Sequence, residues 1–254
     1  MDFVPFLNQK NPMKNIIIAL LFMIGLNSYA QNTDRSFMVL NETKVKDMEV
    51  FRKNMSVMNP HLIERFKGIL SSRTVQRSET GLMYTLSFIS GAENLGKFYT
   101  MRYDGSDNFS AANPKIDQEM SANWDGSARR STWIRINALD NLPEDYKVEN
   151  YKFRRILIET IPAGQQEDYE KQAVEGRELQ SKLGINMMSV TFRAVEGYPN
   201  NTYITFMQDT SIVDYYIHRE ERNQKRSASK EYGEFMKKSI KTNVIRMDHL
   251  FYEF

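Results

Sequence analysis

Seven residues of this chain combine aromatic rings with charged, amide and imidazole groups, the mixture from which a small-molecule pocket is built. Apolar walls supply affinity in such a pocket, and a few polar groups fix the orientation of the ligand. All seven lie on or beside runs that alternate in the manner of β-strands, so their placement depends on strand geometry. The predicted ligand-binding residues are Asn41, Trp133, Arg135, Glu159, His249, Phe251 and Glu253.

Two of these side chains also suit proton transfer. Glu159 or His249 could act as a general base if burial or a neighbouring charge moved its pKa towards neutrality. The alternative is structural: Arg135 pairs with Glu159 or Glu253, and His249 is a hydrogen-bonded histidine near a strand end. Structural ion-pair networks perturb pKa values as active sites do, so both interpretations stay open and enzymatic activity is undecided.

Other chemistries lack the residues that they require. The chain has three histidines, His61, His218 and His249, none at H-x-x-x-H spacing, and it has no cysteine, so no metal site is predicted. No G-x-S-x-G turn is present to carry a serine nucleophile. The sequence GAENLG at 91–96 lacks the G-x-G core and the Lys-Ser/Thr pair of a phosphate-binding loop. We therefore expect no cofactor.

The elements that position the seven residues follow one order twice along the chain. Alternation with period 2 predicts strands, and period 3.6 predicts helices, with turn-rich stretches such as GYPNN at 197–201 between them. The first half is predicted to contain strands at 36–43, 73–78, 82–89 and 131–137 and helices at 46–69, 93–102 and 114–123. The second half is predicted to contain strands around 156–158 and at 187–194, 202–208 and 244–254, and helices at 165–183, 211–222 and 230–241.

Segments of the two halves also read alike. FYTMR at 98–102 matches YYIHR 117 positions later, and MYTLSFIS from 83 matches TYITFMQD 119 positions later. A polar stretch that carries Pro143 separates the halves. We therefore predict a tandem duplication, with a first half at 31–139, a linker at 140–152 and a second half at 153–254.

Strand, helix, two strands, helix and strand is the ferredoxin-like order, in which helices cover one face of an antiparallel sheet. Because the other face is left bare, two such halves are stabilised by packing sheet to sheet. The predicted fold is α+β: two tandem ferredoxin-like (βαββαβ) halves that form an intrachain α/β barrel, an internal pseudo-dimer within a monomer. This arrangement resembles the dimeric α/β-barrel superfamily, which includes antibiotic-biosynthesis monooxygenase-like proteins and chlorite-dismutase-like haem proteins. The resemblance spans residues 36–254 through element order, and no signature motif assigns a catalytic residue.

Strand parity predicts which side chains face the space between the sheets. The wholly apolar sets, Met38 with Leu40 and Ile156 with Ile158, are expected under the helices, so that Asn41 and Glu159 point between the sheets. On the last strand of each half, the set with Trp133 and Arg135 and the set with His249, Phe251 and Glu253 are expected there too. A slip of one residue in register would exchange every one of these assignments.

The first thirty residues have the layout of a secretory signal peptide. A lysine at 14 precedes an apolar run at 16–26 and small residues at 28 and 30, so cleavage is expected after Ala30, and Met13 is the expected start of translation. The run is shorter than the roughly 20 residues that a bilayer span needs, and no second such run follows. We expect an exported protein, periplasmic or secreted, with no stable membrane span after cleavage.

Charge excludes one class of partner. The chain carries 34 basic and 32 acidic residues, a formal net charge of +2, without a strongly basic region. Nucleic-acid binding is therefore not expected. Two functions from different classes remain: an exported barrel that binds a small apolar or aromatic ligand between its sheets, or a non-catalytic cell-envelope interaction or structural module. An open cavity favours the first, and a filled interior with paired charges favours the second.

Overall fold

The computed structural model describes residues 35–104, 108–143, 146–147 and 150–253. The first half of the described chain consists of β1 (Ser36–Val45), α2 (Met48–Arg65), β2 (Leu70–Ser78), β3 (Leu82–Ser90), α3 (Ala92–Tyr103), α4 (Phe109–Ala112), α5 (Pro114–Asn123) and β4 (Trp124–Arg135). A short 3-10 helix, η1 (Asn137–Leu139), leads out of it. The second half consists of β5 (Phe153–Thr160), α6 (Gln166–Lys182), β6 (Met188–Glu196), β7 (Thr202–Asp209), α7 (Ile212–Ala228), α8 (Lys230–Lys238) and β8 (Asn243–Tyr252).

The strands form one closed antiparallel barrel in the order β1-β3-β2-β8-β5-β7-β6-β4. Within it, the first half contributes the sequence β4-β1-β3-β2 and the second half contributes β8-β5-β7-β6. Each half therefore arranges its strands in the same way. The halves join along two seams, where Gln76–Ser78 of β2 pairs with β8 and Thr132–Arg135 of β4 pairs with β6.

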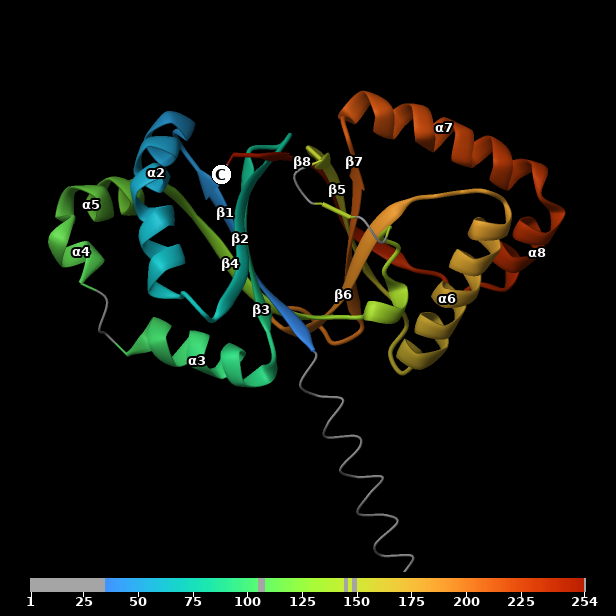
Figure 1. Cartoon of the computed structure of the whole chain (residues 1–254), viewed down its shortest axis with the longest axis horizontal. Helices are drawn as coiled ribbons and strands as arrows, with labels where there is room; N and C mark the ends of the chain where they lie inside the picture. Colours follow the sequence, from blue (N-terminus) through green and yellow to red (C-terminus); the bar gives the residue numbers. More distant parts are fainter. Residues whose placement is uncertain (1–34, 105–107, 144–145, 148–149, 254) are drawn as a thin grey trace, which may run out of the picture.

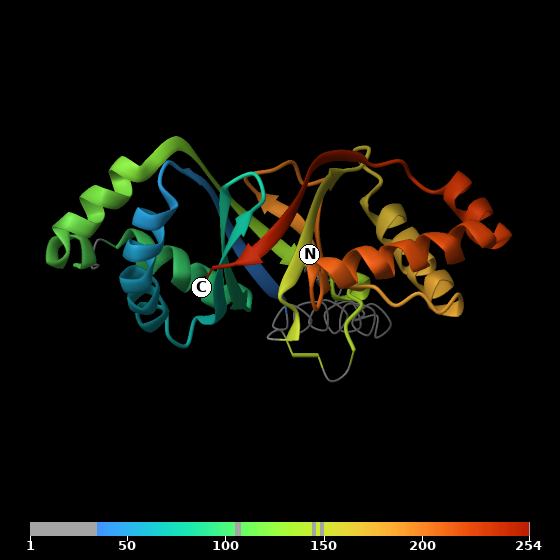
Figure 2. The same cartoon turned by 90° about the horizontal axis from the view of Figure 1, so that it is seen from above.

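The helices form two groups on opposite sides of this barrel. Figure 1 shows α2 to α5 on one side and α6 to α8 on the other, and Figure 2 shows the same separation from above. Side-chain caps fix where several helices begin: the Asp47 carboxylate accepts from the backbone N–H groups at the start of α2, and Ser211 and Ser229 cap α7 and α8. Each sheet thus has one face towards the barrel interior and one towards helices.

The sequence predictions agree with most of these elements. The helix predicted at 114–123 has the bounds of α5, and α3, α6 and most strands differ from their predictions by one or two residues. The prediction was wrong for the start of the last strand of the first half, because β4 begins at Trp124 rather than at 131. The predicted signal peptide lies outside the described residues. Within the part of the chain that is described, no helix is long and apolar enough to cross a bilayer.

Candidate functional site

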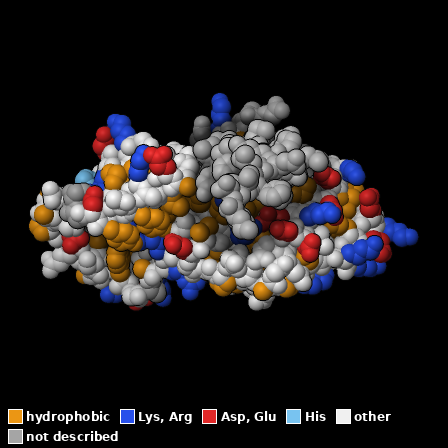
Figure 3. Space-filling model, turned by 90° about the horizontal axis from the view of Figure 1, so that it is seen from below, with side chains coloured by type: hydrophobic (Ala, Val, Ile, Leu, Met, Phe, Trp, Pro, Cys, Tyr) orange, Lys and Arg blue, Asp and Glu red, His pale blue; other side chains and the backbone are white. Residues whose placement is uncertain are grey.

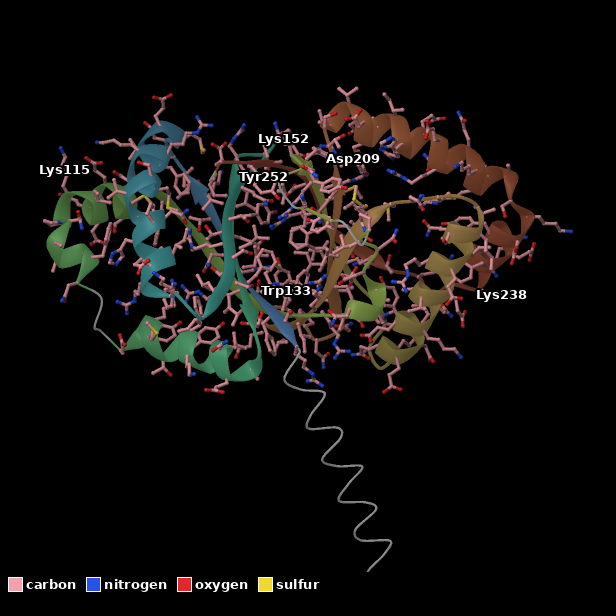
Figure 4. The ribbon with its side chains drawn as sticks, in the orientation of Figure 1. Lys115, Trp133, Lys152, Asp209, Lys238 and Tyr252 are labelled. Carbon is pink, nitrogen blue, oxygen red and sulfur yellow. The ribbon has the colours of Figure 1, made fainter. Side chains whose placement is uncertain are left out.

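The interior of the barrel is filled by side chains from both halves. Trp133 lies at its centre, fully buried, and its indole N–H donates to the Ser131 hydroxyl at 2.7 Å. Figure 4 shows Trp133 among the strands, midway between the helix groups that Lys115 and Lys238 mark. The cluster comprises Met38, Leu40, Tyr84, Leu86, Trp133, Ile156, Ile158, Phe192, Ala194, Ile204, Phe206 and Leu250. The middle of the barrel is thus occupied largely by packed side chains.

Charged groups at one end of the interior are paired. The Tyr84 hydroxyl donates to Asp248 at 2.5 Å, and burial raises the pKa of Tyr84 above its usual value. Arg246 pairs with Glu42, which also accepts a hydrogen bond from Tyr198 at 3.0 Å. This network joins strands of both halves. Each of its charged groups is hydrogen-bonded, as buried charges must be if they are not to cost much stability.

At another part of the interior, Arg135 borders a small recess of about 230 Å³. Its Nε lies 2.5 Å from the Asp140 carboxylate. Burial raises the pKa of Asp140, and the charge of Arg135 partly opposes this shift. Phe88, Phe192 and Phe206 complete the apolar wall of the recess. The volume is below the roughly 300–1,000 Å³ of typical ligand pockets. Arg135 therefore has a structural partner, although not the one that the sequence suggested.

The predicted orientation of the first strands was wrong. Met38, Leu40 and Ile158 face the barrel interior, and Asn41 and Glu159 face the helices. The physical reason is that both faces of β1 and β5 are covered, one by the opposite sheet and one by helices, so apolar residues occur on both. Apolarity therefore could not identify the helix-facing side, and the one-residue ambiguity inverted the assignment.

The predicted orientation of β8 was inverted in the same way. Leu250 enters the interior, whereas His249, Phe251 and Glu253 face outward. The ring of His249 packs against Phe153, 5.5 Å between centroids, and its Nδ1 lies 3.4 Å from Glu79. Glu253 binds two arginines described below. Of the seven predicted residues, only Trp133 and Arg135 face the interior.

The predicted site lay between the two sheets, but the two large cavities described here lie outside the barrel, one between each sheet and its helices. The first, here called the α6–α8 cavity, measures about 580 Å³. Its floor is the outer face of the second sheet and is rich in hydroxyls from Ser189, Thr191 and Thr205. Its opposite wall is apolar, with Phe235 and Met236 of α8. The cavity therefore has a polar side, towards the sheet, and an apolar side, towards α8.

Glu159 is the acidic group at the floor of the α6–α8 cavity. The residue is only 8% exposed, and its Oε1 accepts a hydrogen bond from the Tyr169 hydroxyl at 2.9 Å. Tyr169 packs against Tyr203, 4.7 Å between ring centroids, and burial raises its pKa above the usual range. Among the described residues no cation pairs with Glu159, and its Oε2 has no hydrogen-bond partner. This second carboxylate oxygen is thus available to a ligand in the cavity.

The second cavity lies between the first sheet and helices α2, α3 and α5, and is here called the α2–α3 cavity. It measures about 590 Å³ and is lined by apolar side chains that include Phe51, Met55 and Met83. Asn41 belongs to its wall, where it accepts a hydrogen bond from Arg130 Nε at 2.8 Å. The two cavities occupy corresponding places in the two halves but differ in charge.

Sequence reasoning singled out Glu159 and Asn41, which line cavities on the helix side of the sheets rather than between them, and it missed their neighbours. Tyr169 lies on α6, ten residues after Glu159, and only the fold brings the two together. None of the three histidines lines either cavity, and no group of three or more His, Asp or Glu among the described residues could hold a metal ion. The chemistry available at the α6–α8 cavity is therefore hydrogen bonding and proton acceptance by a carboxylate.

Comparison with solved structures shows the fold that this chain shares with known proteins. No protein-family model and no curated protein matches the sequence. A monooxygenase-like protein from Lactobacillus acidophilus NCFM superimposes with a TM-score of 0.53 at 8% identity, over 87% of this chain and 95% of the other. An anthrone oxidase-like protein gives 0.52 at 12%, over 86% and 92%, and a monooxygenase-like protein from Fusobacterium nucleatum gives 0.51 at 10%, over 87% and 94%. The chain has the dimeric α/β-barrel fold of the ferredoxin-like class.

Proposed function

We propose that this protein is an exported barrel that binds a small apolar or aromatic ligand, and that the ligand lies in the α6–α8 cavity rather than between the two sheets. The observation that carries the proposal is the buried Glu159 carboxylate at the floor of a cavity of about 580 Å³. A buried charge without a charged partner is costly unless something else satisfies it. A ligand that donates a hydrogen bond to Oε2 does so.

The lining indicates the chemistry of that ligand. Tyr232, Phe235 and Ile240 offer apolar contact on the helix side, while Thr191 and Thr205 offer hydroxyls on the sheet side. A flat molecule with one apolar face and one hydrogen-bond donor fits both walls. The descriptions of the structural neighbours as monooxygenase-like and anthrone oxidase-like are compatible with an aromatic ligand.

Glu159 could also accept a proton from such a ligand, which is the first step of many reactions at activated carbon or oxygen. Tyr169 would then hold the carboxylate in place through its hydrogen bond of 2.9 Å. Export rests on the pattern of residues 13–30, and a monomer is proposed because one chain closes the barrel. Tandem duplication is proposed from the repeated element order.

The filled barrel interior supports the second candidate, a non-catalytic module of the cell envelope. Its central cluster is packed and the network at Tyr84, Asp248 and Arg246 is satisfied, as a purely structural barrel requires. Under that function the α6–α8 cavity is an unoccupied gap. The two candidates therefore differ in whether Glu159 contributes to binding.

Native mass spectrometry of the protein purified from its own host tests the proposal first. We expect a chain that begins at Gln31 and carries a co-purifying small molecule. For titration, the neutral fluorophore 1-anilinonaphthalene offers an N–H donor on an aromatic body. We expect Glu159→Gln to weaken its binding about tenfold, and Ala173→Phe, which fills the α6–α8 cavity, to abolish it.

The matched control is Glu167→Gln, an exposed carboxylate in the first turn of α6. It should leave binding unchanged. Equal affinity in the parent protein and in Glu159→Gln and Ala173→Phe, together with a purified chain free of small molecules, would favour the structural module.

A further inference from the structure

The α2–α3 cavity is lined by charges of a single sign. Its lining contains five arginines and no aspartate or glutamate among the described residues, namely Arg65, Arg73, Arg102, Arg129 and Arg130. They come from α2, β2, α3 and β4, so the fold rather than a local run gathers them. A concentration of like charge around an apolar cavity is unfavourable unless an anion offsets it.

Arg73 is the member whose environment is least explained by the protein itself. Its Nη1 is buried and has no hydrogen-bond partner among the described residues. Burial, reinforced by the charge of Arg102, lowers the pKa of Arg73 to about 10, so its guanidinium remains charged at neutral pH. The pKa of Arg102 is lowered as well, by partial desolvation of its guanidinium and by the charge of Arg130, although the residue as a whole is exposed. Buried N–H groups without partners are rare in folded proteins and point to a missing acceptor.

Two of the other arginines, Arg130 and Arg65, have polar partners that hold them in place. Arg130 Nη1 donates to the Tyr103 hydroxyl at 2.7 Å, and its Nε donates to Asn41. Arg65 lies 3.2 Å from Asp104 at the end of α3. These contacts fix guanidinium groups around the cavity without neutralising Arg73. Pre-organised arginines of this kind recognise carboxylate, sulfonate or phosphate oxygens.

The rest of the cavity is apolar. Phe51, Met55 and Met83 belong to a packed cluster on one side, and Phe66 to another cluster on the other side. Trp124, 46% exposed, stands where the cavity meets solvent. Figure 3 shows hydrophobic side chains gathered on the half of the surface that carries α2 to α5. The cavity volume of about 590 Å³ can hold a ring system or a folded alkyl chain as well as an anionic group.

We propose that the α2–α3 cavity is a second ligand site, independent of the α6–α8 cavity, and that it binds an amphipathic anion: an aromatic or alkyl body that carries one carboxylate, sulfonate or phosphate group. The anionic group binds Arg73 and Arg102, and the body lies against Phe51, Met55 and Met83. The two halves of the barrel thus bind ligands of different charge.

Two fluorophores that differ by one group test this assignment on the full-length mature protein. 1-Anilinonaphthalene-8-sulfonate carries an anion on the skeleton of the neutral 1-anilinonaphthalene. We expect Arg73→Met and Arg102→Met each to weaken sulfonate binding at least about tenfold, because each removes a charged hydrogen-bond donor. Binding of the neutral probe should change less than about twofold, because its site lacks these arginines. Two variants keep the test informative if one of them fails to fold.

Arg219→Met, on the exposed surface of α7, removes the same charge elsewhere and should leave both probes unaffected. Glu159→Gln should leave sulfonate binding unchanged, so failure of this proposal is distinguishable from failure of the α6–α8 site. Sulfonate affinity that is unchanged in both arginine variants would overturn the proposal. Equal loss of both probes would also overturn it, because the arginines would then support the fold rather than an anion.

Discussion

At the scale of single residues, charged side chains of opposite sign mark the two cavities: Glu159 is buried, and Arg73 is half-buried. Glu159 has a tyrosine but no cation beside it, and Arg73 has a buried N–H without an acceptor. In the barrel interior, by contrast, Arg246 is paired with Glu42. Because an unpaired buried charge costs several kcal/mol, its presence in both cavities is better explained by a ligand than by stability.

Glu253 shows the opposite behaviour, because its charge stabilises the fold. Its carboxylate lies 2.7 Å from Arg52 of α2 and 2.9 Å from Arg77 of β2. The hydrogen bond from Arg52, followed by that from Arg77, lowers the pKa of Glu253 below its usual value, although burial opposes the shift. A lowered pKa in the folded state means stabilisation that is present above the unfolded pKa of about 4.3 and is lost as the pH falls through the folded value.

We therefore expect the Tm of the parent protein to fall between about pH 5 and pH 3 more steeply than that of Glu253→Gln. At pH 7 the variant should be less stable, and the two melting curves should converge in acid. Circular dichroism across this pH range measures both effects. Glu221→Gln, an exposed carboxylate on α7, is the control and should melt as the parent does. Parallel pH profiles for parent and Glu253→Gln would show that the ion pairs contribute nothing.

Only some of the residues that line the two cavities could be singled out from the sequence, and the reason is physical. Glu159 and Asn41 are polar residues on otherwise apolar strands, which is a local signal, and both line cavities. Arg73, Arg102 and Tyr169 give no such signal, because charged and aromatic residues on helices and strand ends are ordinary surface composition. Their proximity to one another arises only from tertiary structure.

At the scale of elements, periodicity and turn residues predicted the order and most bounds, because each helix and strand has its own local pattern. The face of each strand could not be predicted. β1 is buried over Phe37–Leu40, so that consecutive residues, not alternate ones, are shielded from solvent. The start of β4 was missed because Asp125, Gly126, Ala128 and Arg129 are charged or small and exposed, which is unusual for a strand.

The loop between β6 and β7 contains the residue with the least tolerance for substitution. Gly197 has a φ of +82°, and a Cβ there would lie 2.4 Å from the Arg130 carbonyl oxygen of β4. Gly81, in the corresponding loop between β2 and β3, has the same φ of +82° with open space around it. We expect Gly81→Ala to cost about 1–2 kcal/mol for the backbone conformation alone.

Gly197→Ala should cost at least about 2 kcal/mol more than Gly81→Ala, since the β4–β6 seam must open to accommodate a methyl group. Urea unfolding gives the free energy of unfolding of each variant. Because the two glycines have the same φ, the difference between the two losses is the cost of the steric overlap at Gly197. Equal destabilisation by the two substitutions would mean that the seam adjusts freely at Gly197.

At the scale of the whole molecule, closure of the barrel makes the two halves interdependent. The seams are short, with three residue pairs between β2 and β8 and four between β4 and β6. The interior cluster, in contrast, contains large side chains from both halves, including Trp133 and Leu40 of the first and Phe192 and Ile156 of the second. Apolar burial, rather than strand pairing, therefore supplies most of the stabilisation between the halves.

The segment 31–139 expressed alone tests this interdependence. Without the second half it exposes the buried inner face of its sheet, with Met38, Tyr84 and Trp133, and the open edges of β2 and β4. Such a surface drives association, so we expect this segment to form dimers or larger species, or to precipitate, while the complete mature chain remains monomeric. Size-exclusion chromatography with light scattering distinguishes these states. A folded, monomeric half that unfolds cooperatively would show that each sheet is stable without the other, and that the packed interior is not what holds this barrel together.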